Sequence, residues 1–241
     1  MTRQMPTRSA SCSHCALNEV CFGGGVSGTD LFNIKTHAVS HLPSFMKGDS
    51  IFQQGDHFHN LYAIRAGMVK VYCEYGPCQE RIQGFYLPGD IIGLEAIVQG
   101  AHTAHAVALD TTTVCALPYQ NLASLQKQMP ELLDQMVRLM SQEVQSSQVY
   151  ASMLTQKNAE QRVAQFFVTM ARKYQARGYE HMQFRLNILH RDLANYLNLT
   201  PETVSRILGK FHRQGWVSWK RREVHIGDMA ALESCMAQVQ C

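Results

Sequence analysis

The sequence predicts an α+β protein: an N-terminal antiparallel β-roll of the cupin or jelly-roll kind, one long helix, and a C-terminal helical domain that ends in a β-hairpin. Short apolar runs broken by turn residues give way to a glycine-free segment, and a basic region follows. The 241 residues can bury more than one core. We expect an arm over 1–28, the β-roll over 29–128, the long helix over 129–157 and the last domain over 158–241.

Short strands are expected between about residues 45 and 117. Asn60–Ile64, Met68–Tyr72 and Ile82–Leu87 are rich in β-branched and aromatic residues. Turn pairs such as Gly55-Asp56 and Pro88-Gly89 separate these runs. Short strands at nearly regular spacing are typical of an antiparallel barrel or sandwich.

The long helix carries an apolar repeat. Residues 129–157 contain no glycine, and their single proline, Pro130, falls in the first turn, where it is tolerated. Apolar or small residues recur with the average 3.5-residue period of a two-stranded coiled coil, and we predict that this seam joins two copies of the chain. The alternative is one amphipathic helix lying on its own domain. The seam comprises Leu133, Val137, Met140, Val144, Ser147, Ala151 and Leu154.

The last domain contains a helix-turn-helix pattern. After a helix over 158–178, His190–Leu197 forms a short helix and Asn198-Leu199 the turn. Thr200 is a good N-cap for the next helix, and Pro201 suits its first position. Two short strands, Trp216–Trp219 and Glu223–Ile226, are expected beyond it, so the pattern predicts a winged helix-turn-helix.

The second helix of this motif can read DNA bases. Glu202, Ser205 and Arg206 fall on one outer face near its start, where recognition helices contact bases. Arginine can donate two hydrogen bonds to guanine, glutamate can accept from cytosine N4, and serine can reach a base or a phosphate. The alternative is a helical hairpin with solvated charges. Expected phosphate contacts are Thr200, Thr203, Lys210, Lys220, Arg221 and Arg222, the last three at the tip of the wing.

The charge distribution agrees with this assignment. The net charge is only +3, but residues 157–223 hold 13 Lys and Arg against 5 Asp and Glu, a balance of +8. The rest of the chain therefore holds 9 basic residues (22 − 13) against 14 acidic ones (19 − 5). A basic third beside an acidic remainder favours a module for double-stranded DNA next to one with another task, although charge alone fits a solvated basic face equally well.

Three of the eight cysteines are grouped near the N-terminus. No secretory signal or run of about 20 apolar residues is present, so we expect a cytoplasmic protein without a membrane span. Grouped cysteines in a reducing compartment indicate metal or redox work. Cys12, Cys15 and Cys21 can wrap a metal centre, and a cubane cluster needs a fourth ligand such as Cys115. Structural zinc with His14 and incidental cysteines are the alternatives.

Four segments together resemble the oxygen-sensing FNR branch of the FNR/CRP transcription regulators: the cysteine arm, Val114–Pro118, Asn158–Arg162 and Leu199–Arg206. The likeness runs from about Cys12 to about Ile226. It implies a sensory β-roll, a dimerisation helix, and a [4Fe–4S] cluster on Cys12, Cys15, Cys21 and Cys115 that favours an active homodimer.

The resemblance also implies how DNA is used. Glu202, Ser205 and Arg206 would read TTGAT-like half-sites arranged as an inverted repeat, and RNA polymerase would be a partner in activation and repression. One departure stands out, because the best-known members carry an acidic residue where this chain has Ser147. In those members the charge opposes pairing of the two helices when the cluster is absent. Here the weak apolar seam or Glu143 takes over that role, or oxygen controls the dimer less tightly.

Other functions fit the sequence less well. A cyclic phosphate needs a cationic partner, and residues 84–126 contain no Lys or Arg. A haem sensor would need an axial ligand such as His57, His59, His102 or His105, but these histidines are better explained as surface or packing residues. No nucleotide fingerprint or nucleophile–base motif indicates a redox enzyme. We therefore expect no enzyme and no cyclic nucleotide, while zinc or thiol redox sensing remains an alternative signal.

Overall fold

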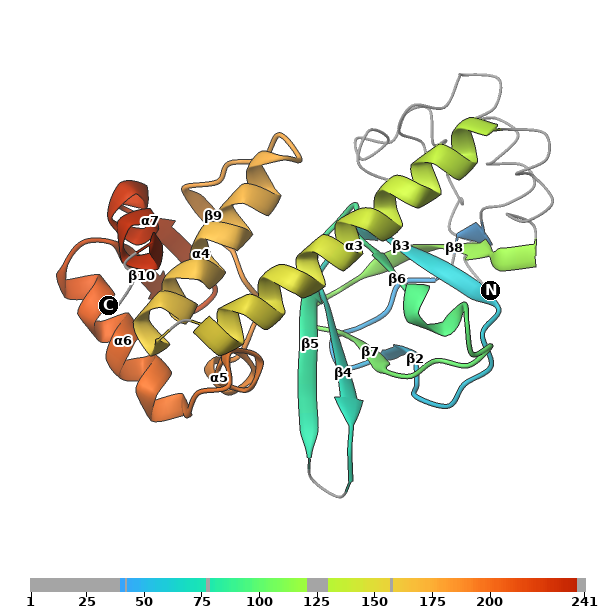
Figure 1. Ribbon diagram of the computed structural model, residues 1–241, viewed down its shortest axis with the longest axis horizontal. Helices are drawn as coiled ribbons and strands as arrows, with labels where there is room; N and C mark the ends of the chain where they lie inside the picture. The colour runs from blue at the N-terminus through green and yellow to red at the C-terminus, as the bar shows by residue number, and fades with distance from the viewer. Residues whose placement is uncertain (1–39, 42, 77–78, 121–129, 157, 238–241) are drawn as a thin grey trace, which may run out of the picture.

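The computed structural model describes residues 40–41, 43–76, 79–120, 130–156 and 158–237. Cys12, Cys15, Cys21 and the arm over 1–28 lie outside the described residues. Figure 1 shows a β-sheet part joined to a helical part by one long diagonal helix, α3 (Pro130–Gln156). This arrangement confirms the predicted α+β class.

In the part of the chain that the structure describes, two four-stranded antiparallel sheets form the β-roll. One has the order β1-β8-β3-β6, and the other has the order β2-β7-β4-β5. Facing apolar side chains, such as Ile64 of the first sheet and Val69 of the second, are almost fully buried between them. The strands are β1 (Ser40–His41), β2 (Ser50–Phe52), β3 (Asn60–Ala66), β4 (Val69–Glu74), β5 (Glu80–Tyr86), β6 (Ile91–Ile92), β7 (His105–Ala108) and β8 (Thr113–Pro118).

The three predicted strands exist as β3, β4 and β5, with ends shifted by one or two residues. Strands β2, β6 and β7 were not predicted, because two to four residues are too few to show an alternating pattern. Gly67 makes the turn between β3 and β4 with φ +89°, and a Cβ there would collide with Thr112. Only glycine combines this backbone with such a close approach.

Within the described residues, four helices and a small sheet follow α3. Helix α4 (Ala159–Gln175) begins at a capping box, in which Asn158 and Gln161 each accept a backbone N–H of the other. The predicted helix-turn-helix is present as α5 (His190–Leu197) and α6 (Pro201–Arg213). The sheet has the order β10-β11-β9, with β10 (Val217–Lys220), β11 (Glu223–Ile226) and β9 (Gln183–Arg185), and α7 (Met229–Ala237) closes the described chain.

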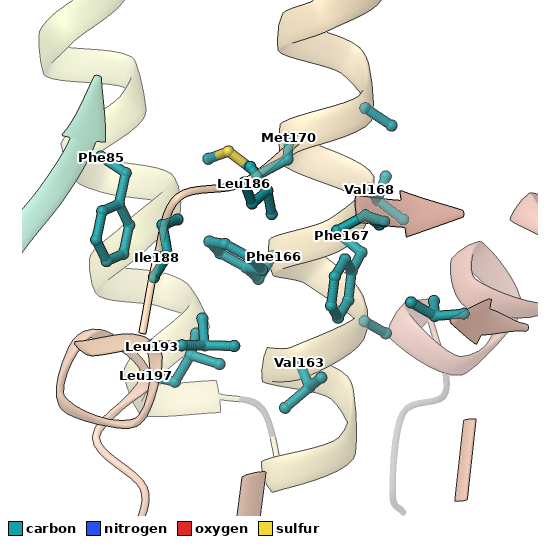
Figure 2. Close-up of a cluster of buried hydrophobic side chains, with 14 of the residues drawn as sticks. Phe85, Val163, Phe166, Phe167, Val168, Met170, Leu186, Ile188, Leu193 and Leu197 are labelled. Carbon is teal, nitrogen blue, oxygen red and sulfur yellow. The ribbon is translucent and has the colours of Figure 1, made fainter. Parts of the chain in front are cut away.

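The β-roll and the helical part share one core. Phe85 of β5 lies edge-on to Phe166 of α4 and to Tyr196 of α5, with ring centroids 6.2 and 5.4 Å apart. Figure 2 shows Phe85 facing Phe166 and Ile188 across the space between the strand and the helices. The apolar cluster therefore continues from the β-roll into the helical part, rather than stopping at α3.

Among the described residues, no helix is both long and apolar enough to cross a bilayer.

Candidate nucleic-acid interface and cysteine site

Helix α6 starts where the sequence predicts. Asn198 has φ 53° and ends α5 in the left-handed conformation that asparagine tolerates. Thr200 then caps α6, because its Oγ1 accepts a hydrogen bond from Thr203 N at 3.2 Å. Pro201 occupies the first turn, where no N–H is needed. These local preferences fix the start of the helix and thereby the position of the side chains that follow.

Helix α6 has one buried and one open face. Val204, Ile207 and Phe211 pack into the shared core with at most 1% exposure. Glu202, Ser205 and Arg206 are exposed together on the opposite side, and we call these three residues the reading face. The N–H of Glu202 and the Thr200 hydroxyl lower the pKa of the Glu202 carboxyl. The carboxylate is therefore ionised at neutral pH and can only accept hydrogen bonds.

The wing is a tight hairpin. Lys220 pairs with Glu223, so Arg221 and Arg222 form its two-residue turn, with Arg221 at φ 57°. Lys220, Arg221 and Arg222 are all exposed. The third strand, β9, pairs with β11 and was not predicted. Three charges at an exposed tip suit the sugar-phosphate backbone of a nucleic acid.

Three of the expected phosphate contacts, Lys210, Thr203 and Thr200, have partners among the described residues. Lys210 Nζ lies 2.7 Å from Glu160 Oε2 of α4, so its charge is balanced by an acidic neighbour. The Thr203 hydroxyl is 3.1 Å from that of Thr200. Sequence spacing could not reveal the Lys210–Glu160 pair, because the two residues are 50 positions apart.

Cys115 lies on β8 beside the first half of α3. It is half-buried and packs in an apolar cluster with Met136 and Met140 of that helix. The other described cysteines, Cys73 and Cys235, are buried at 5% and 7% exposure. Cys73 Sγ lies 3.2 Å from Thr103 O, and burial raises the pKa of its thiol, which disfavours the thiolate that a metal requires. Among the described cysteines, Cys115 is therefore the one whose exposure suits a metal ligand.

Helix α3 leaves most of the predicted seam open. Val137 and Val144 are 56% and 57% exposed, while Met136 and Met153 on the other side are buried against the rest of the chain. The side chain of Leu133 lies outside the described residues. Of the remaining seam residues, Ser147 and Ala151 are exposed and Met140 and Leu154 are half-buried.

Glu143 does not lie on this open face. Its Oε1 accepts a hydrogen bond from the Tyr86 hydroxyl of β5 at 3.0 Å. Burial raises the pKa of the Glu143 carboxyl. The side chain is thus occupied by a contact within its own chain.

In the loop over 93–102, Glu95 and His102 contact each other, and His102 also packs on β2. Gly93 has φ 93°, and a 3₁₀ turn (Leu94–Ala96) follows it. Glu95 Oε1 lies 3.0 Å from His102 Nδ1, and the His102 ring stacks on Phe52 with centroids 3.8 Å apart. His105 stacks on Tyr72 instead. Within the described residues, no three His, Cys, Asp or Glu side chains are grouped for a metal ion.

The β-roll, the long helix and the helix-turn-helix with one exposed face on α6 together define a class: DNA-binding transcription regulators with a Crp-like helix-turn-helix domain. The family model for the Crp-like helix-turn-helix domain matches residues 161–235, and that for the cyclic nucleotide-binding domain matches residues 42–129.

Similarity to individual proteins identifies the family within this class. The chain is 37% identical over 221 residues to the fumarate and nitrate reduction regulatory proteins of Salmonella typhimurium and Escherichia coli K12, covering 92% of this chain and 88% of theirs. The structure of FixK2 from Bradyrhizobium japonicum is similar with a TM-score of 0.75 at 25% identity, over 84% of this chain and 99% of that one. The chain belongs to the FNR/CRP family of transcription regulators.

Proposed function

We propose that this chain is an oxygen-responsive regulator of anaerobic gene expression, active as a cytoplasmic homodimer that carries a [4Fe–4S] cluster and binds TTGAT-like inverted repeats. In this proposal residues 1–28 form the cluster-binding arm, 29–128 the sensory domain, 129–157 the dimerisation helix and 158–241 the DNA-binding domain. The observation that carries it is the half-buried Cys115 on β8, packed against the helix whose other face is open.

The donor set fits a cluster. Cys12, Cys15 and Cys21 would hold it together with Cys115, and four thiolates are the usual ligands of a cubane. When bound, the cluster supplies iron and sulfide that oxygen can oxidise. Cys73 and Cys235 are too deeply buried to join the set without disrupting their surroundings. Zinc at the same cysteines is the competing assignment.

Cys115 connects the cysteine site to dimerisation through packing. Its neighbours Met136 and Met140 are on α3. Met136 directly precedes the exposed Val137, and Met140 lies one turn before the exposed Val144. A change in the position of Cys115 therefore acts on the helix that would pair with a second copy. Exposed valines on one stripe of a helix favour such pairing, because burying them removes apolar area from water.

Ser147 makes the proposed switch depend on weak packing. A serine on the seam cannot repel its symmetry mate, and Glu143 bonds to Tyr86 of its own chain. In this proposal the dimer is only weakly stable, because Ser147 and Ala151 are small and bury little apolar area between the two helices. Marginal pairing is what allows a modest change at Cys115 to alter the dimer population.

DNA recognition would use the reading face and the wing. Glu202, Ser205 and Arg206 would contact base edges, and the wing tip with Thr200 would contact phosphates. Lys210 can add to the phosphate contacts only by giving up its pair with Glu160. RNA polymerase is the expected partner of the bound dimer.

A cyclic nucleotide is not part of this proposal. In the domain that matches the cyclic nucleotide-binding family, His102 bonds to Glu95 and its ring stacks on Phe52. A histidine engaged with a carboxylate cannot offer a phosphate the bidentate contact of an arginine.

The test is anaerobic purification of wild type, Cys115→Ser and Cys73→Ser, followed by iron and acid-labile sulfide analysis and by molecular mass before and after air. We expect wild type to be a brown dimer whose molecular mass falls to that of a monomer in air. Cys115→Ser should contain little iron, and Cys73→Ser should behave like wild type. Normal iron and sulfide in Cys115→Ser would contradict the ligand assignment. A colourless protein containing zinc would overturn the cluster.

A further inference from the structure

The outer edge of strand β5 is covered by a helix of the reading domain. β5 is the last strand of the order β2-β7-β4-β5, so its outer N–H and C=O groups have no neighbouring strand among the described residues. Such groups need other partners when they are shielded from water. Helix α5, the first helix of the helix-turn-helix, lies against this edge.

One side chain of α5 supplies two of those partners. Asn195 Oδ1 accepts a hydrogen bond from Ile82 N at 2.8 Å, and Asn195 Nδ2 donates one to Glu80 O at 2.7 Å. A carboxamide carries the same donor and acceptor as a peptide group. Asn195 therefore pairs with β5 as the next strand of the sheet would.

Arg81 strengthens the contact from the strand side. It lies between Glu80 and Ile82, and its guanidinium donates to Asn195 O at 3.2 Å and to Asn198 Oδ1 at 3.3 Å. A third hydrogen bond, also 3.2 Å long, goes to the Tyr150 hydroxyl of α3. One side chain thus contacts the end of α5 and the dimerisation helix at once.

The contact fixes the reading helix without covering it. Leu193 and Leu197 of α5 pack in the same core as Val204 and Ile207 of α6, so the two helices behave as one body. The reading face stays exposed while α5 is held on β5. An autoinhibitory contact would instead hide those residues.

We propose that Asn195, together with Arg81, is a positioning residue for DNA binding. Its amide holds each reading helix at a fixed place relative to the β-roll and α3, and hence to the dimer axis. The pair of reading helices then matches one half-site spacing. This inference rests on the proposed binding of a homodimer to an inverted repeat.

The experiment compares duplexes that differ in spacing, using cluster-loaded protein under anaerobic conditions. One duplex carries the TTGAT-like inverted repeat, a second has one base pair inserted between the half-sites, a third has a single half-site, and a fourth has a scrambled sequence. An inserted pair turns one half-site by about 34° relative to the other, since B-DNA has about 10.5 base pairs per turn. If the two reading helices are held at a fixed spacing, they cannot both contact their half-sites in this duplex, and the affinity falls.

The variants are Asn195→Ala and Arg81→Ala. Gln175→Ala and Arg65→Ala are matched controls, since both residues are exposed and lie on other elements. Two hydrogen bonds of ordinary net strength correspond to about a tenfold change in binding. We expect Asn195→Ala to bind the native repeat about tenfold more weakly and to lose most of its preference over the inserted spacing. Its affinity for the single half-site should stay within about twofold.

The outcomes separate the two hypotheses. If wild type binds the repeat no better than scrambled DNA, the proposed function fails, and this inference fails with it. If wild type discriminates between the spacings and both variants discriminate equally well, only the positioning role is wrong. Tighter binding of the native repeat by Asn195→Ala would identify an inhibitory contact and overturn the inference. Should Asn195→Ala not fold, Arg81→Ala provides the same comparison with the amide intact.

Discussion

Asp90 connects the β-roll to helix α4 and the residues after it through a cluster of ion pairs. The loss of stability on removing its charge can be calculated from the structure. Lys173 Nζ lies 3.1 Å from Asp90 Oδ2, and the Arg177 guanidinium donates to Oδ1. The side chains of Asp90 and Arg177 are only 19% and 8% exposed. Breaking a buried pair by removing one partner costs about 3–5 kcal/mol. Asparagine keeps one acceptor oxygen and the site is not fully dry, so we expect Asp90→Asn to lower the free energy of unfolding by roughly 2 kcal/mol.

The measurement is urea unfolding at pH 7, with all proteins in the same buffer and metal state. A lower midpoint with an unchanged slope reports a loss of stability. Glu233→Gln is the matched control, because its pair with Arg172 is 2.9 Å long but 45% and 61% exposed. An exposed pair of this kind contributes less than about 1 kcal/mol.

The same variant gives a pH dependence with a defined sign. Burial alone would raise the pKa of Asp90, but Lys173 and Arg177 outweigh it and hold the pKa below its usual 3.8. A lowered folded-state pKa means that the stabilisation is fully present above about pH 4 and is lost as the pH falls through the folded value. The difference between wild type and Asp90→Asn should therefore be constant near neutrality and shrink in acid. Equal losses for Asp90→Asn and Glu233→Gln, or a difference that grows in acid, would refute this reasoning.

Three further substitutions test other parts of the structure. Thr200→Ala should cost about 1 kcal/mol of stability through loss of the α6 cap, and Thr200→Ser should restore most of it; an equal loss in both would contradict the cap. Phe166→Ala should cost about 3–5 kcal/mol, because the 2%-exposed ring packs against both parts of the molecule; a loss below about 1 kcal/mol would show that the core is not shared. Val144→Glu should reduce the anaerobic dimer fraction measured by light scattering, whereas Val149→Glu, exposed but off the seam, should not; equal effects would argue against the seam.

The helix-turn-helix was predictable because its signals are local. Thr200, Pro201 and Asn198 each act within one turn of their own position, and the structure uses them as the sequence indicates. The separation of α6 into an apolar and a polar face follows from the helical period and is equally local. The reading face was therefore placed on the exposed side of α6 without knowledge of the rest of the molecule.

Short or uniformly apolar elements were not predicted. Strand β9 has three residues, and α7 is apolar on most of its surface, so neither shows a period that distinguishes it from a loop or a buried strand. Both depend on neighbours for their formation, since β9 pairs with β11 and α7 packs on α4. Tertiary contact, rather than intrinsic preference, stabilises them.

By itself, the sequence determined the order of β-roll, long helix and reading domain, the start of α6, and the residues on its outer face. Only the tertiary structure decided that the β-roll and the reading domain share a core, that Asn195 completes the edge of β5, and that Lys210 pairs with Glu160. The reason is physical. Periodicity and capping act over a few residues, whereas Asn195 and Ile82 are 113 positions apart and meet only because the chain has folded.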